Sequence, residues 1–202
     1  MRRCRFLLAI VRAVRSAVGP AFAIGVKLNT ADFQRGGFTI EEAMDVARAL
    51  DAAGIDLLEI SGGNYESPAM VGRESTRARE AYFLDYARQI RAVVATPIML
   101  TGGMRSRAVM DAAIAAGSID VVGLARPMTH APELPAHLLD GSLAAAPAVA
   151  IHSRFRRVDD ALQTMWFQAQ IHELARGREP DLALGKLTAL WRGVRVLAGT
   201  AA

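Results

Sequence analysis

The sequence predicts an α/β fold in which a parallel sheet is built from successive βα units. Four apolar runs bounded by glycine, proline or polar residues alternate with stretches of helical periodicity, which is typical of strands joined by crossover helices. The predicted strands are Phe22–Leu28, Ile55–Ile60, Ile98–Leu100 and Ile119–Leu124. Their spacing is close to that of a (β/α)8 barrel, which needs eight such units and typically about 250 residues. A chain of 202 residues with four units is therefore expected to form half of such a barrel, followed by helices.

Each segment between the strands carries a helical signal of its own. Thr39 followed by Glu42 forms a capping box at the start of one helix, and Ser106 is expected to cap another. Further helices are predicted at residues 77–94, 158–175 and 182–197. Trp166 and Trp191 are expected to pack the last two helices on the body of the protein. The βα pattern breaks after Gly141, so we expect a half-barrel over residues 1–141 and a helical extension over residues 142–202.

The composition excludes several classes of protein. The hydrophobic fraction of 52% supports a sizeable core, and the formal charge of +4 comes almost wholly from scattered arginines, with Lys27 and Lys186 the only lysines. This pattern gives no indication of a nucleic-acid partner. The single cysteine, Cys4, excludes an internal disulfide and a cysteine-based metal cluster, and the histidines lack metal-ligand spacing. Arg12 and Arg15 interrupt the N-terminal apolar stretch, so neither a signal peptide nor a membrane span is indicated, and we expect a cytoplasmic protein.

The stretch from Thr96 to Arg126 carries the first candidate site. Gly102 and Gly103 follow one predicted strand, and Ala125 and Arg126 follow the next. One turn offers backbone N–H groups and the other a guanidinium, which together suit a phosphate. Parallel βα barrels often bind phosphate on the loops after their last two strands. A diglycine by itself indicates a simple turn as readily as a ligand site. The presence of Arg126 after the next strand favours the ligand site.

Lys27 is the second candidate, because it interrupts an otherwise apolar strand near its C-terminal end. A lysine on a buried strand needs an acceptor, and an ion pair with Glu59 on the neighbouring strand would supply one. Alternatively, the ammonium group faces negative charge that develops on a cofactor or intermediate. Both interpretations stay open. Structural roles are expected for Asp32, which orders its loop, for Asp56, and for Glu59, which balances Lys27 or Arg126.

Five segments, read in order, closely resemble the old yellow enzyme family, whose members are NADH:flavin oxidoreductases and FMN-bound (β/α)8 barrels. The segments are GVKLNTADFQRGGF, LLEISGGNYESP, REAYFLDYARQIR, PIMLTGGMRS and DVVGLARPM. The resemblance covers Arg5 to about Gly141, and the segment WFQAQIHELARGREPD is similar to the family's C-terminal helices. It implies that the chain is the C-terminal half of the barrel, strands five to eight, and begins in the helix after the fourth strand.

The resemblance also implies roles for individual residues. Lys27 matches the basic residue that faces the pyrimidine edge of the flavin, where it stabilises negative charge around N1 and O2. Gly102 and Gly103 match the backbone that cradles the FMN phosphate, and Ala125 and Arg126 match the second half of that phosphate site. Family members pass hydride from NAD(P)H to flavin N5 and then to the β-carbon of an α,β-unsaturated carbonyl compound. The expected cofactors are therefore FMN and NAD(P)H, and the expected substrate is of the enone type.

The resemblance further implies that the first four strands are absent, together with the histidine-type pair that holds the substrate carbonyl and the tyrosine proton donor. No catalytic acid is therefore assigned, and Tyr65 is either a substrate contact or a loop anchor. A half-barrel has two exposed strand edges that invite pairing, so a missing N-terminal half or a second copy is the expected partner. Two alternatives remain: a phosphate-binding barrel lyase or isomerase, and a non-catalytic remnant.

Overall fold

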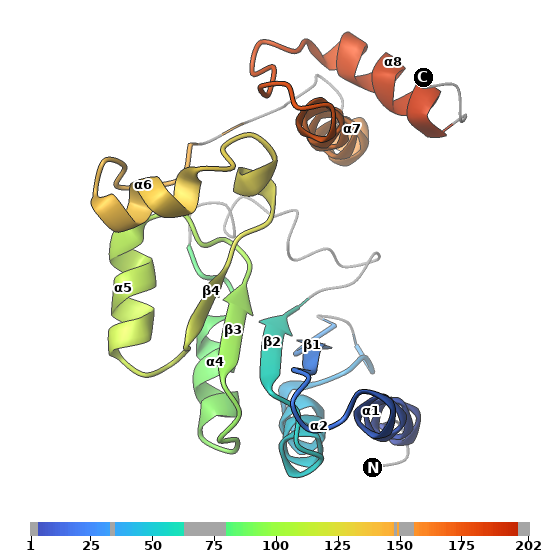
Figure 1. Ribbon diagram of the computed structural model, residues 1–202, viewed down its shortest axis with the longest axis vertical. Coiled ribbons are helices and arrows are strands. Elements are labelled where there is room, and N and C mark those ends of the chain that lie inside the picture. Colours follow the sequence, from blue (N-terminus) through green and yellow to red (C-terminus); the bar gives the residue numbers. More distant parts are fainter. Residues whose placement is uncertain (1–3, 33–34, 63–79, 148, 150–155, 198–202) are drawn as a thin grey trace. The chain divides into compact units, whose positions relative to one another are not determined.

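The computed structural model describes residues 4–32, 35–62, 80–147, 149 and 156–197, which fall into two compact units (Figure 1). The first unit is Met1–Gly123 and the second is Leu124–Ala202. This division lies ahead of the boundary expected from the sequence at residues 141 and 142. Each unit is described by itself below. Within the described residues, no helix has the length and apolarity to cross a bilayer.

The first unit contains a four-stranded sheet in which each strand pairs in parallel with the next, in the order β1-β2-β3-β4. Its strands are β1 (Gly25–Asn29), β2 (Leu57–Ser61), β3 (Ile98–Thr101) and β4 (Val121–Gly123). Its helices are α1 (Arg5–Val18), α2 (Ile40–Ala52), α4 (Leu84–Arg91) and α5 (Arg107–Ala115). A helix separates each pair of consecutive strands, so the predicted α/β fold with a parallel sheet is confirmed.

The two faces of this sheet differ in burial. Side chains alternate between the faces of a strand, and one face presents Leu58, Ile60, Ile98 and Leu100, which are fully buried. Helices α2 and α4 pack against this side of the unit (Figure 1). The opposite face is more open in the described residues, and Val121 on it is 40% exposed. An open face of a parallel sheet is unusual, because such sheets are normally covered on both sides.

The N-terminal ends of β2 and β4 are fastened in the same way by an aspartate. Asp56 accepts hydrogen bonds from the Ile24 N–H at 2.7 Å and from Arg15 of α1 at 2.5 Å. Asp120 accepts a hydrogen bond of 2.7 Å from the first N–H of β3 and forms an ion pair with Arg91 of α4. The Ile24 and Arg15 hydrogen bonds hold the pKa of Asp56 below its ordinary value. The structural role expected for Asp56 is confirmed.

Asp51 near the end of α2 holds the turn that leads into β3. Its Oδ1 accepts from the Thr96 hydroxyl at 2.6 Å, the Thr96 N–H at 2.8 Å and the Ala95 N–H at 3.1 Å. Thr96 is buried, so water cannot readily replace the carboxylate as its partner. The hydrogen bond from the Thr96 side chain is the main cause that lowers the pKa of Asp51. The carboxylate thus ties α2 to the start of β3.

We expect Asp51→Ala to lower the free energy of unfolding by about 1–3 kcal/mol at neutral pH, because it leaves buried donors of Thr96 unpaired. Since the folded-state pKa is lowered, the ionised carboxylate stabilises the fold above the ordinary aspartate pKa, and this contribution disappears as pH falls through the lowered value. Denaturant unfolding measured from neutral to acidic pH should show the difference shrinking. Asp45→Ala, an exposed acid of the same helix, is the control, and a deficit that is independent of pH would contradict the assignment.

Most local sequence signals of the first unit hold in the structure. The Thr39–Glu42 capping box is present, with both hydrogen bonds at 3.3 Å. Ser106 is the N-cap of α5, but its hydroxyl donates to Glu80 and caps no helical N–H. Asp32 orders its loop as expected, because its backbone and side chain both bond to Phe38.

The helix predicted at residues 77–94 is shorter in the structure: α4 begins only at Leu84. The residues just before Leu84 form backbone hydrogen bonds with a distant turn. The N–H groups of Ala81 and Tyr82 donate to the carbonyls of Gly103 and Gly102, each at 3.2 Å. An N–H group that donates to a distant turn cannot also donate to the carbonyl four residues before it. In addition, Ala81 has φ of 49°, which an α-helix does not allow. The predicted start of this helix is therefore wrong for the residues that the structure describes.

The second unit consists of helical segments: η1 (Arg126–Thr129), α6 (Leu134–Asp140), α7 (Arg156–Ala175) and α8 (Lys186–Leu197). A cluster of apolar side chains joins α7, α8 and the loop between them, formed by Leu162, Trp166, Ala169, Leu184 and Ala189. The Trp166 ring is buried and its Nε1 donates to the Leu184 carbonyl at 3.1 Å. Trp191, by contrast, is 58% exposed. Trp191 takes no part in this cluster, and the expected packing of the helix pair on the body of the protein stays a prediction, because each unit is described by itself.

Candidate functional site

The structure places the predicted site residues in both units. Lys27 lies in β1, on the open face of the sheet, near the end of the strand. Gly102 and Gly103 form the turn that follows β3. Ala125 and Arg126 belong to the second unit, at the start of η1. Tyr65, a candidate substrate contact, lies outside the described residues.

Lys27 forms an ion pair with Glu59, its register partner on β2. The Lys27 side chain is 53% exposed and that of Glu59 is 19% exposed. Glu59 also accepts a hydrogen bond of 2.8 Å from the Thr101 hydroxyl of β3. The expected ion pair is therefore confirmed. The ammonium group still has an exposed side, so the pair does not exclude a ligand.

Thr101 connects this pair to the glycine turn, because it is the residue directly before Gly102. It lies in register with Gly123 of β4. A Cβ on Gly123 would collide with the Thr101 hydroxyl oxygen, so glycine at 123 is required for Thr101 to point towards Glu59. Thr101 was not predicted from the sequence as a site residue. The available signal was a hydroxyl side chain at the end of a buried apolar strand.

The glycine turn after β3 has the geometry of a small anion site. Gly102 has φ of 126° and Gly103 has φ of 71°, conformations that side chains rarely adopt. Their carbonyls accept hydrogen bonds from Tyr82 and Ala81. Within the described part of the chain, neither glycine N–H donates to a protein acceptor. Successive free N–H groups in such a turn form an anion-binding concavity, so the turn fits the phosphate of FMN.

Two aromatic rings explain why glycine is needed here even without a ligand. The Phe83 ring is 1% exposed. A Cβ on Gly62, at the end of β2, would lie 2.5 Å from this ring, and a Cβ on Gly102 would lie 2.8 Å from it. A Cβ on Gly103 would lie 2.6 Å from the Tyr82 ring. The structural interpretation of the diglycine is thus supported alongside the ligand interpretation.

We expect Gly62→Ala to destabilise the first unit by about 1–3 kcal/mol, because the added methyl overpacks against Phe83. The backbone at Gly62 needs no positive φ, so the cost is steric. Gly25→Ala is the matched control, since a Cβ there meets Leu57 at an ordinary 3.7 Å. Chemical denaturation followed by circular dichroism measures both variants. The double variant Gly62→Ala/Phe83→Leu should lose less stability than the sum of its parts, and strict additivity would contradict the steric account.

Comparison with known proteins identifies the family of this chain. The model of the NADH:flavin oxidoreductase / NADH oxidase family matches residues 1–142. The chain belongs to this family. The predicted resemblance is therefore confirmed, and the family is one of oxidoreductases. FMN, the predicted cofactor, is in keeping with the family, and so is NADH as one form of the predicted NAD(P)H.

Curated relatives include NADH-dependent flavin oxidoreductases of two fungi. The protein of Neonectria sp. (strain DH2) is 36% identical over 145 residues, which is 66% of this chain and 19% of that protein. The protein of Talaromyces variabilis is 37% identical over 141 residues, 66% of this chain and 34% of that protein. An NADH oxidase of Thermoanaerobacter brockii is 33% identical over 69% of this chain and 21% of its own length. The chain thus spans about a fifth to a third of these relatives.

Solved structures show the same similarity. A 2-naphthoyl-CoA reductase in complex with 2-naphthoyl-CoA is 31% identical, with a TM-score of 0.64 over 71% of this chain and 22% of that chain. The old yellow enzyme homologue of Zymomonas mobilis is 18% identical, with a TM-score of 0.54 over 78% of this chain and 42% of that chain. At that identity the second similarity concerns the fold alone, an α/β fold with a parallel sheet.

Proposed function

We propose that this chain supplies the phosphate-binding half of an FMN-dependent NAD(P)H oxidoreductase, equivalent to strands five to eight of a (β/α)8 barrel. The observation that carries the proposal is a line of polar groups on the open face of the sheet. It runs from Lys27 through Glu59 to Thr101 and ends at the glycine turn. Barrel enzymes hold their ligands at this end of the strands, and family membership makes FMN the ligand.

When bound, FMN supplies hydride transfer between the nicotinamide and the substrate. Lys27 provides the positive charge that stabilises negative charge at the edge of the flavin ring. Glu59 holds the ammonium group in place, and the Thr101 hydroxyl orients Glu59 by donating to it. The carboxylate also offsets part of the lysine charge, so the pair attracts an anion less strongly than a lone lysine would.

The phosphate end of the site uses backbone groups. The N–H groups of Gly102 and Gly103 bind phosphate oxygens, and their inward carbonyls stay bonded to Ala81 and Tyr82. We propose Ala125 and Arg126 as the second half of this phosphate site. Arg126 suits this role because a guanidinium binds phosphate in a bidentate manner. The position of Arg126 supports this role, because it lies three residues after Gly123, the register partner of Thr101.

The substrate class follows from the family chemistry, which reduces a double bond conjugated to a carbonyl. We propose an α,β-unsaturated carbonyl compound as substrate, NADH or NADPH as reductant, and the cytoplasm as location. The group that donates the final proton is expected on the half of the barrel that carries strands one to four. The described residues supply the groups that are proposed to bind the cofactor.

Completion of the site requires further βα units, and the surface of the first unit supports this. The open face of the sheet exposes Lys27 and Val121, and β1 and β4 are edge strands. Helix α1 also exposes Phe6 (79%) and Ile10 (44%). Exposed sheet edges pair with other strands unless they are covered. We propose that the first four units of the barrel, or a second copy of this chain, cover this surface.

We expect this chain to bind FMN, and Lys27→Met to weaken the binding about tenfold, because a charge-assisted contact is lost. Lys186→Met is the matched control, since Lys186 is the only other lysine and lies on α8. Quenching of flavin fluorescence on titration measures the affinity. Equal effects of the two substitutions would exclude the assigned role of Lys27, and absence of saturable binding by the unmodified chain would refute the cofactor proposal.

We expect the chain alone to self-associate through the open face, and Val121→Lys to shift it towards monomer, because a charge there opposes burial. Ile114→Lys on α5 is the matched control, since the two side chains are similarly exposed, 40% and 45%. Size-exclusion chromatography with light scattering, over a range of concentrations, measures the mass. A monodisperse monomer of the unmodified chain would show that the open face needs no partner.

A further inference from the structure

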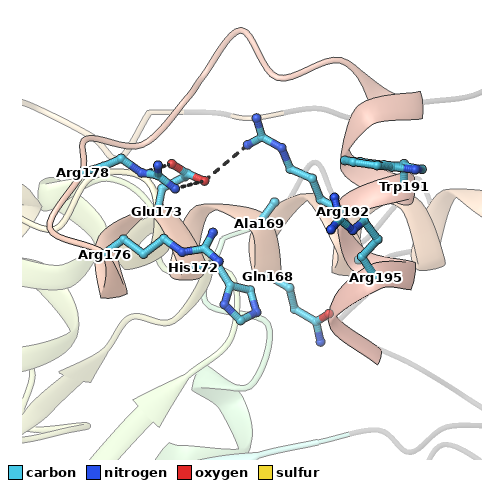
Figure 2. A pocket seen from close by; sticks show the side chains of 10 residues that line it. Gln168, Ala169, His172, Glu173, Arg176, Arg178, Trp191, Arg192 and Arg195 are labelled. Atoms are coloured by element: carbon cyan, nitrogen blue, oxygen red, sulfur yellow. Dashed lines mark hydrogen bonds and ion pairs between the residues drawn. The ribbon is translucent and has the colours of Figure 1, made fainter. Parts of the chain in front are cut away.

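A pocket of about 260 Å³ lies between α7 and α8 in the second unit (Figure 2). Its space arises because small residues line it where the helices are close: Ala169 on α7 and Gly193 on α8. A Cβ on Gly193 would collide with the Met165 side chain. Glycine therefore allows the close approach of the helices and leaves a hollow beside it. The family match ends at residue 142, so this pocket lies outside the matched region.

The lining of the pocket is strongly cationic. Four arginines line it: Arg176, Arg178, Arg192 and Arg195. Glu173 is the single carboxylate among the lining residues. Its side chain is 13% exposed and pairs with Arg178 at 2.7 Å and with Arg192 at 3.4 Å. Four guanidinium groups and one carboxylate therefore line the pocket.

One of these arginines also joins the two helices, because Arg192 of α8 pairs with Glu173 of α7. The core between α7 and α8 is formed by apolar side chains around Trp166. Arg176, Arg178 and Arg195 are exposed residues at the rim of the pocket. Guanidinium groups gathered in one place repel one another. A bound anion would relieve that repulsion.

An aromatic ring accompanies the charges. Trp191 lines the pocket and is 58% exposed. The guanidinium carbon of Arg195 lies 4.7 Å from the centre of the Trp191 ring. Figure 2 shows Trp191, Arg192 and Arg195 projecting from the same helix. An exposed tryptophan beside arginines offers a flat apolar surface next to positive charge, which suits a ligand that has both a ring and a phosphate.

We propose that this pocket binds a small organic phosphate that carries an aromatic ring, at a site separate from the proposed FMN site. Guanidinium groups bind phosphate oxygens in a bidentate manner, and the Trp191 ring stacks on the aromatic part of the ligand. The volume is just below the range of about 300–1,000 Å³ typical of drug-sized ligands. The pocket therefore suits a ligand of mononucleotide size in preference to a dinucleotide.

Isothermal titration calorimetry of the full chain with three probes tests this inference. The probes are adenosine monophosphate, inorganic phosphate and adenosine, which present ring and phosphate together, phosphate alone and ring alone. Adenosine monophosphate should bind saturably and at least about tenfold more tightly than either of the other probes, because it uses both halves of the site. No saturable binding of adenosine monophosphate, or equal affinity for adenosine, would overturn the proposal.

Two substitutions connect binding to the pocket. Arg195→Gln and Trp191→Leu should each weaken binding of adenosine monophosphate about fivefold to tenfold, through loss of one charged contact or of stacking. Arg48→Gln is the matched control, because Arg48 is an exposed arginine on α2 with an ion pair of its own. An equal loss in the Arg48 variant would indicate a general effect of net charge and overturn the assignment.

A third substitution separates this site from the proposed FMN site. Lys27→Met should leave the affinity for adenosine monophosphate unchanged, because Lys27 belongs to the first unit and the pocket to the second. Circular dichroism of each variant checks that the helices are retained. Loss of adenosine monophosphate binding in the Lys27 variant would assign that binding to the flavin site and overturn the proposal of a second site.

Discussion

The buried ring of Phe83 constrains the C-terminal ends of β2 and β3. It fills the space beside Gly62 and Gly102, where a Cβ at either position would overlap it. The same segment donates two backbone hydrogen bonds to the glycine turn. Because the ring is buried and the turn cannot move away from it, the direction in which Gly102 and Gly103 present their N–H groups is set. The geometry of the proposed phosphate site therefore depends on the packing of the Phe83 ring.

Charged groups in the first unit are divided between the two ends of the sheet. Asp56 and Asp120 bind arginines and backbone N–H groups before the strands begin, and Asp51 binds the turn that leads into β3. At the other end, Glu59 holds Lys27 on the open face. Stability of the fold and the proposed binding of a ligand thus depend on different carboxylates. This separation agrees with parallel βα barrels, in which stability residues lie at the N-terminal ends of the strands.

The open face of the sheet is the basis for the proposed dependence of the chain on further protein. A parallel sheet buried on one side leaves Val121 and the stem of Lys27 in water, and hydrophobic burial on that side would add stability. The relatives are three to five times longer than the matched region. The second unit has a different basis for stability, because α7 and α8 close a small apolar core of their own.

Much of the first unit was predictable because its signals are local. The capping box of Thr39 and Glu42 acts over three residues, and apolar runs identified all four strands to within about three residues at each end. The Lys27–Glu59 pair was also predictable, since consecutive βα units bring adjacent strands into register. The order of the five family segments along the chain identified the family.

The sequence by itself therefore determined the strands, the parallel order, the family and the residues proposed to bind FMN. Only the tertiary structure decided the features that join distant parts of the chain. Thr101 reaches Glu59 across 42 positions, and α4 starts late because its leading residues bond to a glycine turn far along the chain. The pocket between α7 and α8 depends on how closely Gly193 lets the two helices approach. Such features depend on contacts in space, and no periodicity or local propensity encodes them.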